Sequence, residues 1–332
     1  MSTVKKTNIS DGYANISGLI FEGTNKEIFS NNVNANIDIA FNNNCNFAGS
    51  GICKWCPKCN KKDPKDDYIM PWATFEKFIG ELAEANYSGN MSLIRYNEAL
   101  LMDIDDLCKR VKYIKDNLPK CKKIGFNTNG SLLTREKLDK LVDAGLTGMN
   151  IQIYPKNEKD RIEFGRDFAE AGRDAYVKKL GVTLNPEKTK IMDGYYYEWK
   201  VADYGDNKQI VMYAKNLTKL GCNRAEAVKT GEQGERVEPC PQIGHFLGID
   251  ANGDVSLCTN FTGVLTEAHR PYIFGNINDD KIWDIYARGL PMIKSLTDEF
   301  NKDNIPTPCK TCMFKPHVAQ IQAVKESLKT RW

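Results

Sequence analysis

Alternating runs of apolar and polar residues along the first half of the chain predict strands and helices in regular succession. The first strand is expected over 35–41, ANIDIAF, where Ile37, Ile39 and Phe41 fall on one face. Three further apolar runs predict strands at 91–96, 122–126 and 148–154. Amphipathic periodicity predicts helices near 73–86, 103–117 and 134–145, and a long helix up to about 180. A βαβ succession of this kind is typical of a parallel sheet.

The pattern is less regular in the second half of the chain. Two strands are expected within YYYEWKVADYG and KQIVMYAKN, joined by a turn at GDN. Beyond residue 223 the sequence predicts loops, a hairpin in HFLGIDANGDVSLC that turns at Asn252–Gly253, and a helix near 279–288. The fold class expected from these patterns is therefore α/β.

A distinctive polar cluster follows each of the first four predicted strands. These clusters are NNNC, NEALLMD, NTNG and the end of QIYP. In open α/β sheets and in barrels, ligands bind at the carboxyl ends of the strands. We therefore expect the four clusters to converge on one site.

Composition favours a small molecule as the substrate. The 46 Lys and Arg residues against 43 Asp and Glu residues leave a formal charge of +3, too little to steer the chain toward nucleic acid or anionic lipid. No signal-peptide core or membrane span is recognisable, so we expect a cytoplasmic protein with neither a membrane nor a nucleic-acid partner. In that reducing compartment, eleven cysteines indicate metal or iron–sulfur ligation rather than disulfides.

Four of the cysteines lie in NNNCNFAGSGICKWCPKC, directly after the first strand. Cys53 and Cys56 form a CxxC pair and Cys45 precedes them, so three thiolates can converge on one corner of a cluster. Cys59 forms a competing CxxC with Cys56. On spacing alone, a structural zinc site with all four thiolates ranks level with an iron–sulfur site. The position of the loop at the ligand end of the first strand favours iron–sulfur.

A second set of cysteines lies in the last third of the chain. Its members are Cys240, Cys258, Cys309 and Cys312, and the gaps between successive members are 17, 50 and two residues. Four thiolates would complete the coordination of a structural or electron-carrying centre. Zinc is the alternative occupant.

These motifs together carry a family resemblance. Trp55 stands directly before the last cysteine of its CxxC, and the NEALL segment follows the second predicted strand. In the last third of the chain, PC is followed by 17 residues and a cysteine, and later by PCKTC. With these motifs, residues 35–314 resemble a radical S-adenosylmethionine (AdoMet) enzyme with a C-terminal twitch-type, SPASM-like auxiliary-cluster domain. The family's usual motif is CxxxCxxC, whereas seven residues separate Cys45 from Cys53 here. A bulge around Gly49 and Gly51 can absorb the extra residues.

The resemblance implies a partial (β/α)6 barrel with parallel strands, followed by a small auxiliary-cluster domain that contains a β-hairpin and a helix. The expected boundaries are an N-terminal extension over 1–34, the barrel over 35–220, the auxiliary domain over 221–314 and a C-terminal helix over 315–332.

The resemblance also implies the chemistry of the first cysteine set. Cys45, Cys53 and Cys56 would bind a [4Fe–4S] cluster and leave one iron open for the amino and carboxylate groups of AdoMet. A cluster of low potential can then cleave AdoMet reductively, and the 5′-deoxyadenosyl radical abstracts hydrogen from an sp3 carbon. The electron would come from a donor such as flavodoxin or ferredoxin.

Five residues are expected to contact AdoMet: Trp55, Glu98, Asn127, Asn129 and Gln152. Glu98 stands where the family's GGE segment binds the amino group of the cofactor, although Tyr96 and Asn97 replace the two glycines. The alternative for Glu98 is a solvent-exposed carboxylate at a helix N-terminus.

The second cysteine set would hold an auxiliary [4Fe–4S] cluster without an open iron, for which electron relay is favoured over a scaffold role. Cys222 is a candidate hydrogen donor to a substrate radical, as in radical epimerases, and a packing cysteine is the alternative. Cys108 and Cys121 are expected to be packing residues. Arg224 and the tyrosines at 195–197 are candidate substrate contacts.

The predicted function is hydrogen abstraction from a polar small molecule, giving epimerisation, isomerisation or oxidation. One alternative is modification of a peptide, which the short segment before the first strand, 34 residues, disfavours. A second alternative is a zinc-binding or iron–sulfur protein without catalysis.

Overall fold

A computed structural model describes residues 19–60, 68–220, 223–228, 240, 242–301, 307 and 309–312. In this part of the chain one sheet of ten strands forms the framework, in the order β10-β9-β8-β1-β2-β3-β4-β7-β6-β5. The strands are β1 (Asn36–Ile39), β2 (Asn90–Ser92), β3 (Lys123–Thr128), β4 (Gly148–Ile153), β5 (Leu184–Met192), β6 (Tyr196–Val201), β7 (Gln209–Lys215), β8 (Phe246–Ile249), β9 (Asp254–Ser256) and β10 (Ile273–Asn276).

Six neighbouring strands of this sheet, from β8 through β1 to β4 and β7, are parallel. The strands at both edges are antiparallel: β10 and β9 follow β8, and β6 and β5 follow β7. The predicted α/β fold with parallel strands, a C-terminal hairpin and a helix is confirmed. One of the six parallel strands, β8, comes from the C-terminal part of the chain.

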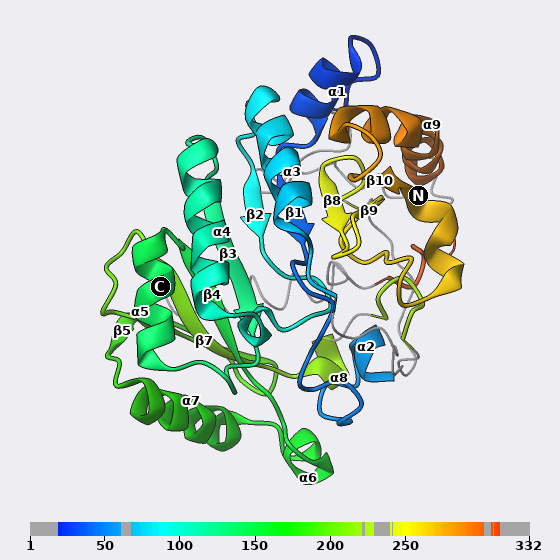
Figure 1. The fold of residues 1–332 in the computed structure, drawn as a ribbon. Helices are drawn as coiled ribbons and strands as arrows, with labels where there is room; N and C mark the ends of the chain where they lie inside the picture. The colour runs from blue at the N-terminus through cyan, green and yellow to red at the C-terminus, as the bar shows by residue number, and fades with distance from the viewer. Residues whose placement is uncertain are drawn as a thin grey trace.

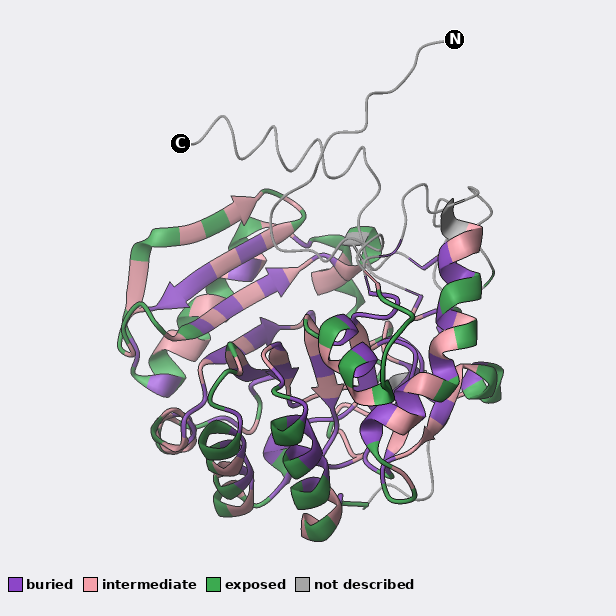
Figure 2. Cartoon of the chain, turned by 90° about the horizontal axis from the view of Figure 1, so that it is seen from above, coloured by how far each residue is buried: buried purple, intermediate pink, exposed green. Residues whose placement is uncertain are grey.

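Helices α3 (Trp72–Glu84), α4 (Ile104–Asn117) and α5 (Arg135–Ala144) cover the outer face of the parallel sheet (Figure 1). The other described helices are α1 (Asn25–Asn32), α2 (Pro57–Asn60), α6 (Glu158–Ile162), α7 (Arg166–Leu180), α8 (Leu217–Leu220) and α9 (Ile282–Asn301), with short 3-10 helices η2 (Ala99–Leu101) and η3 (Glu267–Tyr272). Helices α3, α4 and α5 lie side by side (Figure 1). Their inward faces are buried and their outward faces exposed (Figure 2).

Local capping explains where these helices begin. The Thr134 hydroxyl accepts a hydrogen bond from the Lys137 amide and starts α5, and the Asp103 carboxylate does the same for α4. The long helix expected up to about 180 is two helices, because the chain leaves helical geometry before Gly165, the N-cap of α7. Helix α9 is longer than the predicted 279–288 and contains Pro291.

The described part of the predicted N-terminal extension contains α1, which packs on α9. The rings of Phe29 and Tyr286 meet edge to face at 5.8 Å, and both residues are fully buried. The predicted C-terminal helix over 315–332 lies outside the described residues. The domain boundaries given above remain predictions.

The inner face of the parallel sheet is polar, in contrast to its helix-covered face. In β1, Ile37 and Ile39 are buried in the hydrophobic core, whereas Asn36 and Asp38 alternate with them and line a cavity. In β4, Gln152 faces the same cavity, and in β7 so do Tyr213 and Lys215. The strands therefore present polar side chains to the interior.

Candidate functional site

A cavity of about 480 Å³ lies at the carboxyl ends of the parallel strands. Residues that follow β1, β2, β3 and β4 line it together, including Cys45, Glu98, Asn129 and Tyr154. The prediction that the strand-end clusters converge on one site is confirmed. The reason is geometric, because parallel strands end at the same edge of a sheet.

Cys45, Cys53 and Cys56 all line this cavity. The Cys45 amide donates to Asn44 Oδ1 at 2.7 Å, and the Cys56 amide donates to the Cys53 carbonyl at 3.2 Å, which closes the CxxC into a tight turn. Burial is the main cause that raises the pKa of the Cys45 thiol to about 11, and negative charge on Cys56 contributes to the rise. A cation is therefore needed to hold these sulfurs together as thiolates.

Cys45, Cys53 and Cys56, all among the described residues, are not placed as ligands of one metal ion. Within the described ranges, no group of three or more His, Cys, Asp or Glu side chains is placed to hold one metal ion. The cysteines of a four-iron cluster each bind a different iron, so their sulfurs stand farther apart than ligands of one ion. Cys59 lies in α2, and its side chain is outside the described part of the structure.

Glu98 is a buried carboxylate on the cavity wall, with 2% of its surface exposed. Its Oε1 accepts from the Thr128 hydroxyl at 2.8 Å and from the Leu100 amide at 3.2 Å, and its Oε2 accepts from the Asn129 amide at 2.9 Å. Glu98 caps η2, as the alternative interpretation required, but it is not solvent-exposed. Burial raises its pKa, although these hydrogen bonds oppose the effect.

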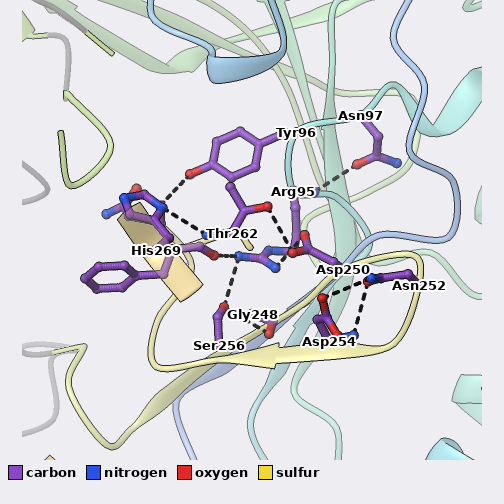
Figure 3. Close-up of polar contacts among 12 residues, drawn as sticks. Arg95, Tyr96, Asn97, Gly248, Asp250, Asn252, Asp254, Ser256, Thr262 and His269 are labelled. Carbon is purple, nitrogen blue, oxygen red and sulfur yellow. Dashed lines mark hydrogen bonds and ion pairs between the residues drawn. The ribbon is translucent and has the colours of Figure 1, made fainter. Parts of the chain in front are cut away.

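Asn97 supplies an unused donor beside Glu98. Its Oδ1 accepts from the Arg95 amide at 2.9 Å (Figure 3). Its Nδ2 is buried and has no hydrogen-bond partner in the described part of the chain, and the residue lines the cavity. A buried donor without an acceptor is unfavourable unless a ligand supplies the acceptor. This atom is therefore available to donate a hydrogen bond to a polar ligand in the cavity.

The other expected AdoMet contacts divide into two groups. Asn127, Asn129 and Gln152 line the cavity, and the Gln152 Oε1 accepts from the Tyr213 hydroxyl at 2.6 Å. Trp55 is partly buried and is not among the described residues that line the cavity. Of the candidate substrate contacts, Arg224 lines the cavity, whereas Tyr197 is buried and donates to Asp193 Oδ1 at 2.5 Å.

Sequence reasoning missed several cavity residues within the strands. Asp38, Ser92, Tyr213 and Lys215 line the cavity from inside β1, β2 and β7. A polar residue at every second position of an otherwise apolar strand is the signal that could have indicated them. Tyr154, which follows β4 and belongs to the predicted QIYP cluster, also lines the cavity, and its ring meets Phe47 edge to face at 5.8 Å.

The second cysteine set is buried in the C-terminal part of the chain. Cys240, Cys258, Cys309 and Cys312 are each 7% exposed. Burial raises the pKa of the Cys258 thiol, and negative charge on Cys240 and Cys309 raises it further, which places these sulfurs near one another. Four buried sulfurs are by their chemistry a donor set for an iron–sulfur cluster or zinc, but among the described residues no three of them are placed around one metal ion.

The remaining cysteines lie away from both sets or outside the description. Cys108 and Cys121 are partly buried and pack against the core, in keeping with a packing role. Cys222, the candidate hydrogen donor, lies outside the described residues.

Comparison with known proteins identifies the C-terminal part of the chain. Residues 240–313 match the family model of SPASM, an iron–sulfur cluster-binding domain. The chain carries a SPASM domain. A search of curated proteins finds no match. The SPASM segment contains all four cysteines of the second set. The sequence resemblance predicted this auxiliary-cluster domain in the same C-terminal position.

Solved structures resemble most of the chain, not only the segment that matches SPASM. BtrN in complex with AdoMet and 2-DOIA has a TM-score of 0.56 and 17% identity, with 86% of this chain and 94% of BtrN covered. An open conformation of BtrN has a TM-score of 0.49 and 15% identity, covering 86% and 93%. Native anSMEcpe with bound AdoMet has a TM-score of 0.43 and 10% identity, covering 90% and 97%.

The predicted α/β fold with a SPASM-type domain in its C-terminal part is thereby confirmed, and BtrN shares this fold. In the described ranges, no helix has the length and apolar character that crossing a membrane requires.

Proposed function

We propose that the chain is a radical AdoMet enzyme that abstracts hydrogen from an sp3 carbon of a polar small molecule, leading to epimerisation, isomerisation or oxidation. The observation that carries the proposal is one cavity that joins three cysteines, a buried carboxylate and strand-end amides. BtrN, whose fold the chain shares, is bound to AdoMet and 2-DOIA in its crystal structure.

Cys45, Cys53 and Cys56 would hold a [4Fe–4S] cluster on one wall of the cavity, and AdoMet would occupy the adjoining space. When bound, these groups supply the electron and the 5′-deoxyadenosyl radical that removes hydrogen from the substrate. Cys240, Cys258, Cys309 and Cys312 would hold the auxiliary [4Fe–4S] cluster.

Glu98 would bind and orient the ammonium group of AdoMet. A carboxylate offers about four acceptor positions, and hydrogen bonds from Leu100, Thr128 and Asn129 use three of them. The same bonds fix the carboxylate before the ligand arrives, so little ordering remains for binding. Asn97 Nδ2, Asn127 and Gln152 would complete the polar contacts.

The lining of the cavity supports a polar substrate. Asp38, Ser92, Lys215 and Arg224, which are not among the proposed AdoMet contacts, supply both charges, donors and acceptors to the cavity lining. Burial raises the pKa of Asp38 to about 6, so this carboxyl group can change its charge near neutral pH.

Cys222 is proposed as hydrogen donor, flavodoxin or ferredoxin as electron donor, and the cytoplasm as location.

Anaerobic reconstitution tests this proposal. The intact chain should bind roughly eight irons, as two four-iron clusters, and the reduced protein should convert AdoMet to 5′-deoxyadenosine and methionine. The triple variant Cys45→Ala, Cys53→Ala, Cys56→Ala should keep about half the iron and lose AdoMet cleavage. Recovery of about two zinc ions per chain and no iron would instead identify a zinc-binding protein.

A further inference from the structure

Asn260 places its side-chain amide directly against one cysteine of the second set. It follows Cys258 by two positions and is 1% exposed. Its Nδ2 donates to Cys312 Sγ across 3.7 Å. A neutral thiol is a weak acceptor, whereas a thiolate bound to iron carries much more negative charge and accepts strongly. The contact is therefore most favourable when Cys312 is a cluster ligand.

Arg224 fixes the direction of this amide. Its Nη1 donates to Asn260 Oδ1 at 3.1 Å. A guanidinium group can only donate, so the oxygen of the amide must face Arg224 and the NH2 group must face the sulfur. The backbone carbonyl of Asn260 also accepts from the Tyr96 hydroxyl at 2.9 Å. Asn260 is thus held by side chains from two separate segments.

The backbone that carries Arg224 is itself strained and supported. Arg224, Ala225 and Glu226 have φ angles of +53°, +51° and +69°, a left-handed run that non-glycine residues rarely adopt. The Ala225 carbonyl accepts from His269 Nε2 at 2.7 Å, while His269 Nδ1 accepts from the Thr262 amide at 3.1 Å. His269 therefore carries its proton on Nε2, and its hydrogen bond to the Ala225 carbonyl supports the left-handed turn.

Arg224 also lines the cavity proposed for AdoMet and substrate. The contacts therefore run without a break from the cavity wall through Arg224 and Asn260 to Cys312 Sγ. Tyr96 lies beside the same path, with the guanidinium carbon of Arg224 6.0 Å from its ring centroid.

We infer that Asn260 raises the reduction potential of the SPASM cluster through its hydrogen bond to Cys312, and that Arg224 is a positioning residue that links this potential to occupancy of the cavity. A donor to a cluster sulfur stabilises the reduced state, because that state carries more negative charge. A substrate group that draws Arg224 toward itself weakens its hold on the amide. The inference rests on the ligand set proposed above for the second cluster.

The test measures the potential of the SPASM cluster alone. The full-length chain with Cys45, Cys53 and Cys56 replaced by Ala is reconstituted anaerobically, so that only this cluster is loaded. Redox titration followed by EPR then gives its midpoint potential. Asn260→Leu, close to Asn in shape but without the donor, should shift the potential to more negative values. Asn260→Asp should shift it further, because a carboxylate would face the sulfur.

Asn117→Leu is the matched control, since Asn117 is exposed at the end of α4 and donates only to the Tyr113 carbonyl among the described contacts. It should leave the potential unchanged. Unchanged potentials in both Asn260 variants at full iron content overturn the inference. If Asn260→Leu fails to load iron, Asn260→Asp carries the measurement.

The role of Arg224 is tested through non-additivity. Arg224→Met should lower the potential in the same direction as Asn260→Leu, and the double variant should shift little beyond the larger single shift. Additive shifts would show that Arg224 acts directly and not through Asn260. The potential is read without AdoMet, so failure of AdoMet cleavage leaves this result intact. Zinc in place of iron would remove the proposed ligand set and the inference together.

Discussion

At the scale of single residues, Glu98 illustrates how one carboxylate serves two purposes. It caps η2 and it ties the loop after β3 to the loop after β2, through Thr128 and Asn129. The cavity wall is consequently rigid at the position where an ammonium group is expected.

Glu98→Gln should weaken AdoMet binding by roughly tenfold to a hundredfold, the range expected when a charge-assisted hydrogen bond is lost. The amide NH2 of Gln would also face the Asn129 amide, a donor against a donor. Equilibrium binding of AdoMet measures the effect. Glu84→Gln, at an exposed site on α3, is the control and should bind AdoMet normally. Equal affinities in the two variants would exclude the role of Glu98.

Cys222→Ala should separate the first and second halves of the reaction. If Cys222 returns hydrogen to the substrate radical, the variant forms 5′-deoxyadenosine at a comparable rate and yields no epimerised product. Mass spectrometry of both products after a single turnover makes the measurement. Cys108→Ala is the matched control, because Cys108 is a partly buried residue of α4. Unchanged product formation in Cys222→Ala would remove Cys222 as the hydrogen donor.

At the scale of elements, the alternation within β1 places apolar and polar residues on opposite faces. Ile37 and Ile39 join the core, and Asp38 faces the cavity. Burial raises the pKa of Asp38 to about 6, while Arg95 and a hydrogen bond from Asn36 oppose the rise.

This shift has a defined sign in a stability measurement. The folded pKa of Asp38 is above its unfolded value, so its ionisation penalises the folded state, and stability falls as the pH rises from about 4 through about 6. Asp38→Asn removes the penalty. Asp38→Asn should therefore have a higher free energy of unfolding than wild type, and this difference should be about 1 kcal/mol larger at pH 7 than at pH 5. Urea unfolding at both pH values measures this gain.

Asp116→Asn, at an exposed position of α4, should show no such change between pH 5 and pH 7. If the free energies of unfolding of Asp38→Asn and wild type differed by the same amount at both pH values, the pKa of the Asp38 carboxyl group would not be raised by folding.

The elements differ in how well the sequence predicts them. Strands β1 to β4 and helices α3 to α5 follow from periodicity, because each has one strongly apolar face. Strand β5 was missed, since it is an edge strand whose residues PEKTK are largely exposed and carry no apolar alternation. The strand-end residues of the site were also predictable, because each directly follows a strand that the periodicity indicates. Arg224 and Asn260 meet through non-local packing, which no spacing encodes.

At the scale of the whole molecule, one buried ion pair joins the SPASM hairpin to the parallel sheet. Arg95, which follows β2, contacts Asp250 at 2.7 Å and Ser256 Oγ at 3.1 Å, and it donates to the Phe261 carbonyl (Figure 3). Its side chain is fully buried. Gly248 makes room for it, since a Cβ there would lie 2.5 Å from the guanidinium carbon.

Arg95→Met should destabilise the folded chain by about 3–5 kcal/mol, because Asp250 would remain buried without its counter-charge. Adding Asp250→Asn should recover part of the loss, since a neutral amide needs no cation. The free energy of unfolding in urea measures both. Lys294→Met breaks an exposed pair with Asp298 and should change stability by less than about 1 kcal/mol. If Arg95→Met and Lys294→Met lowered the free energy of unfolding equally, the stabilising role assigned to the buried Arg95–Asp250 pair would be contradicted.

The pairing of β8 with β1 has a consequence for how this protein is made. β1 ends at Ile39, and β8 does not begin until Phe246, so the growing polypeptide leaves the ribosome with one flank of its first strand uncovered. An uncovered flank invites association with other nascent chains. Translation must therefore reach the hairpin before the sheet can close, and a ribosome that stalls in between would release a protein prone to aggregate.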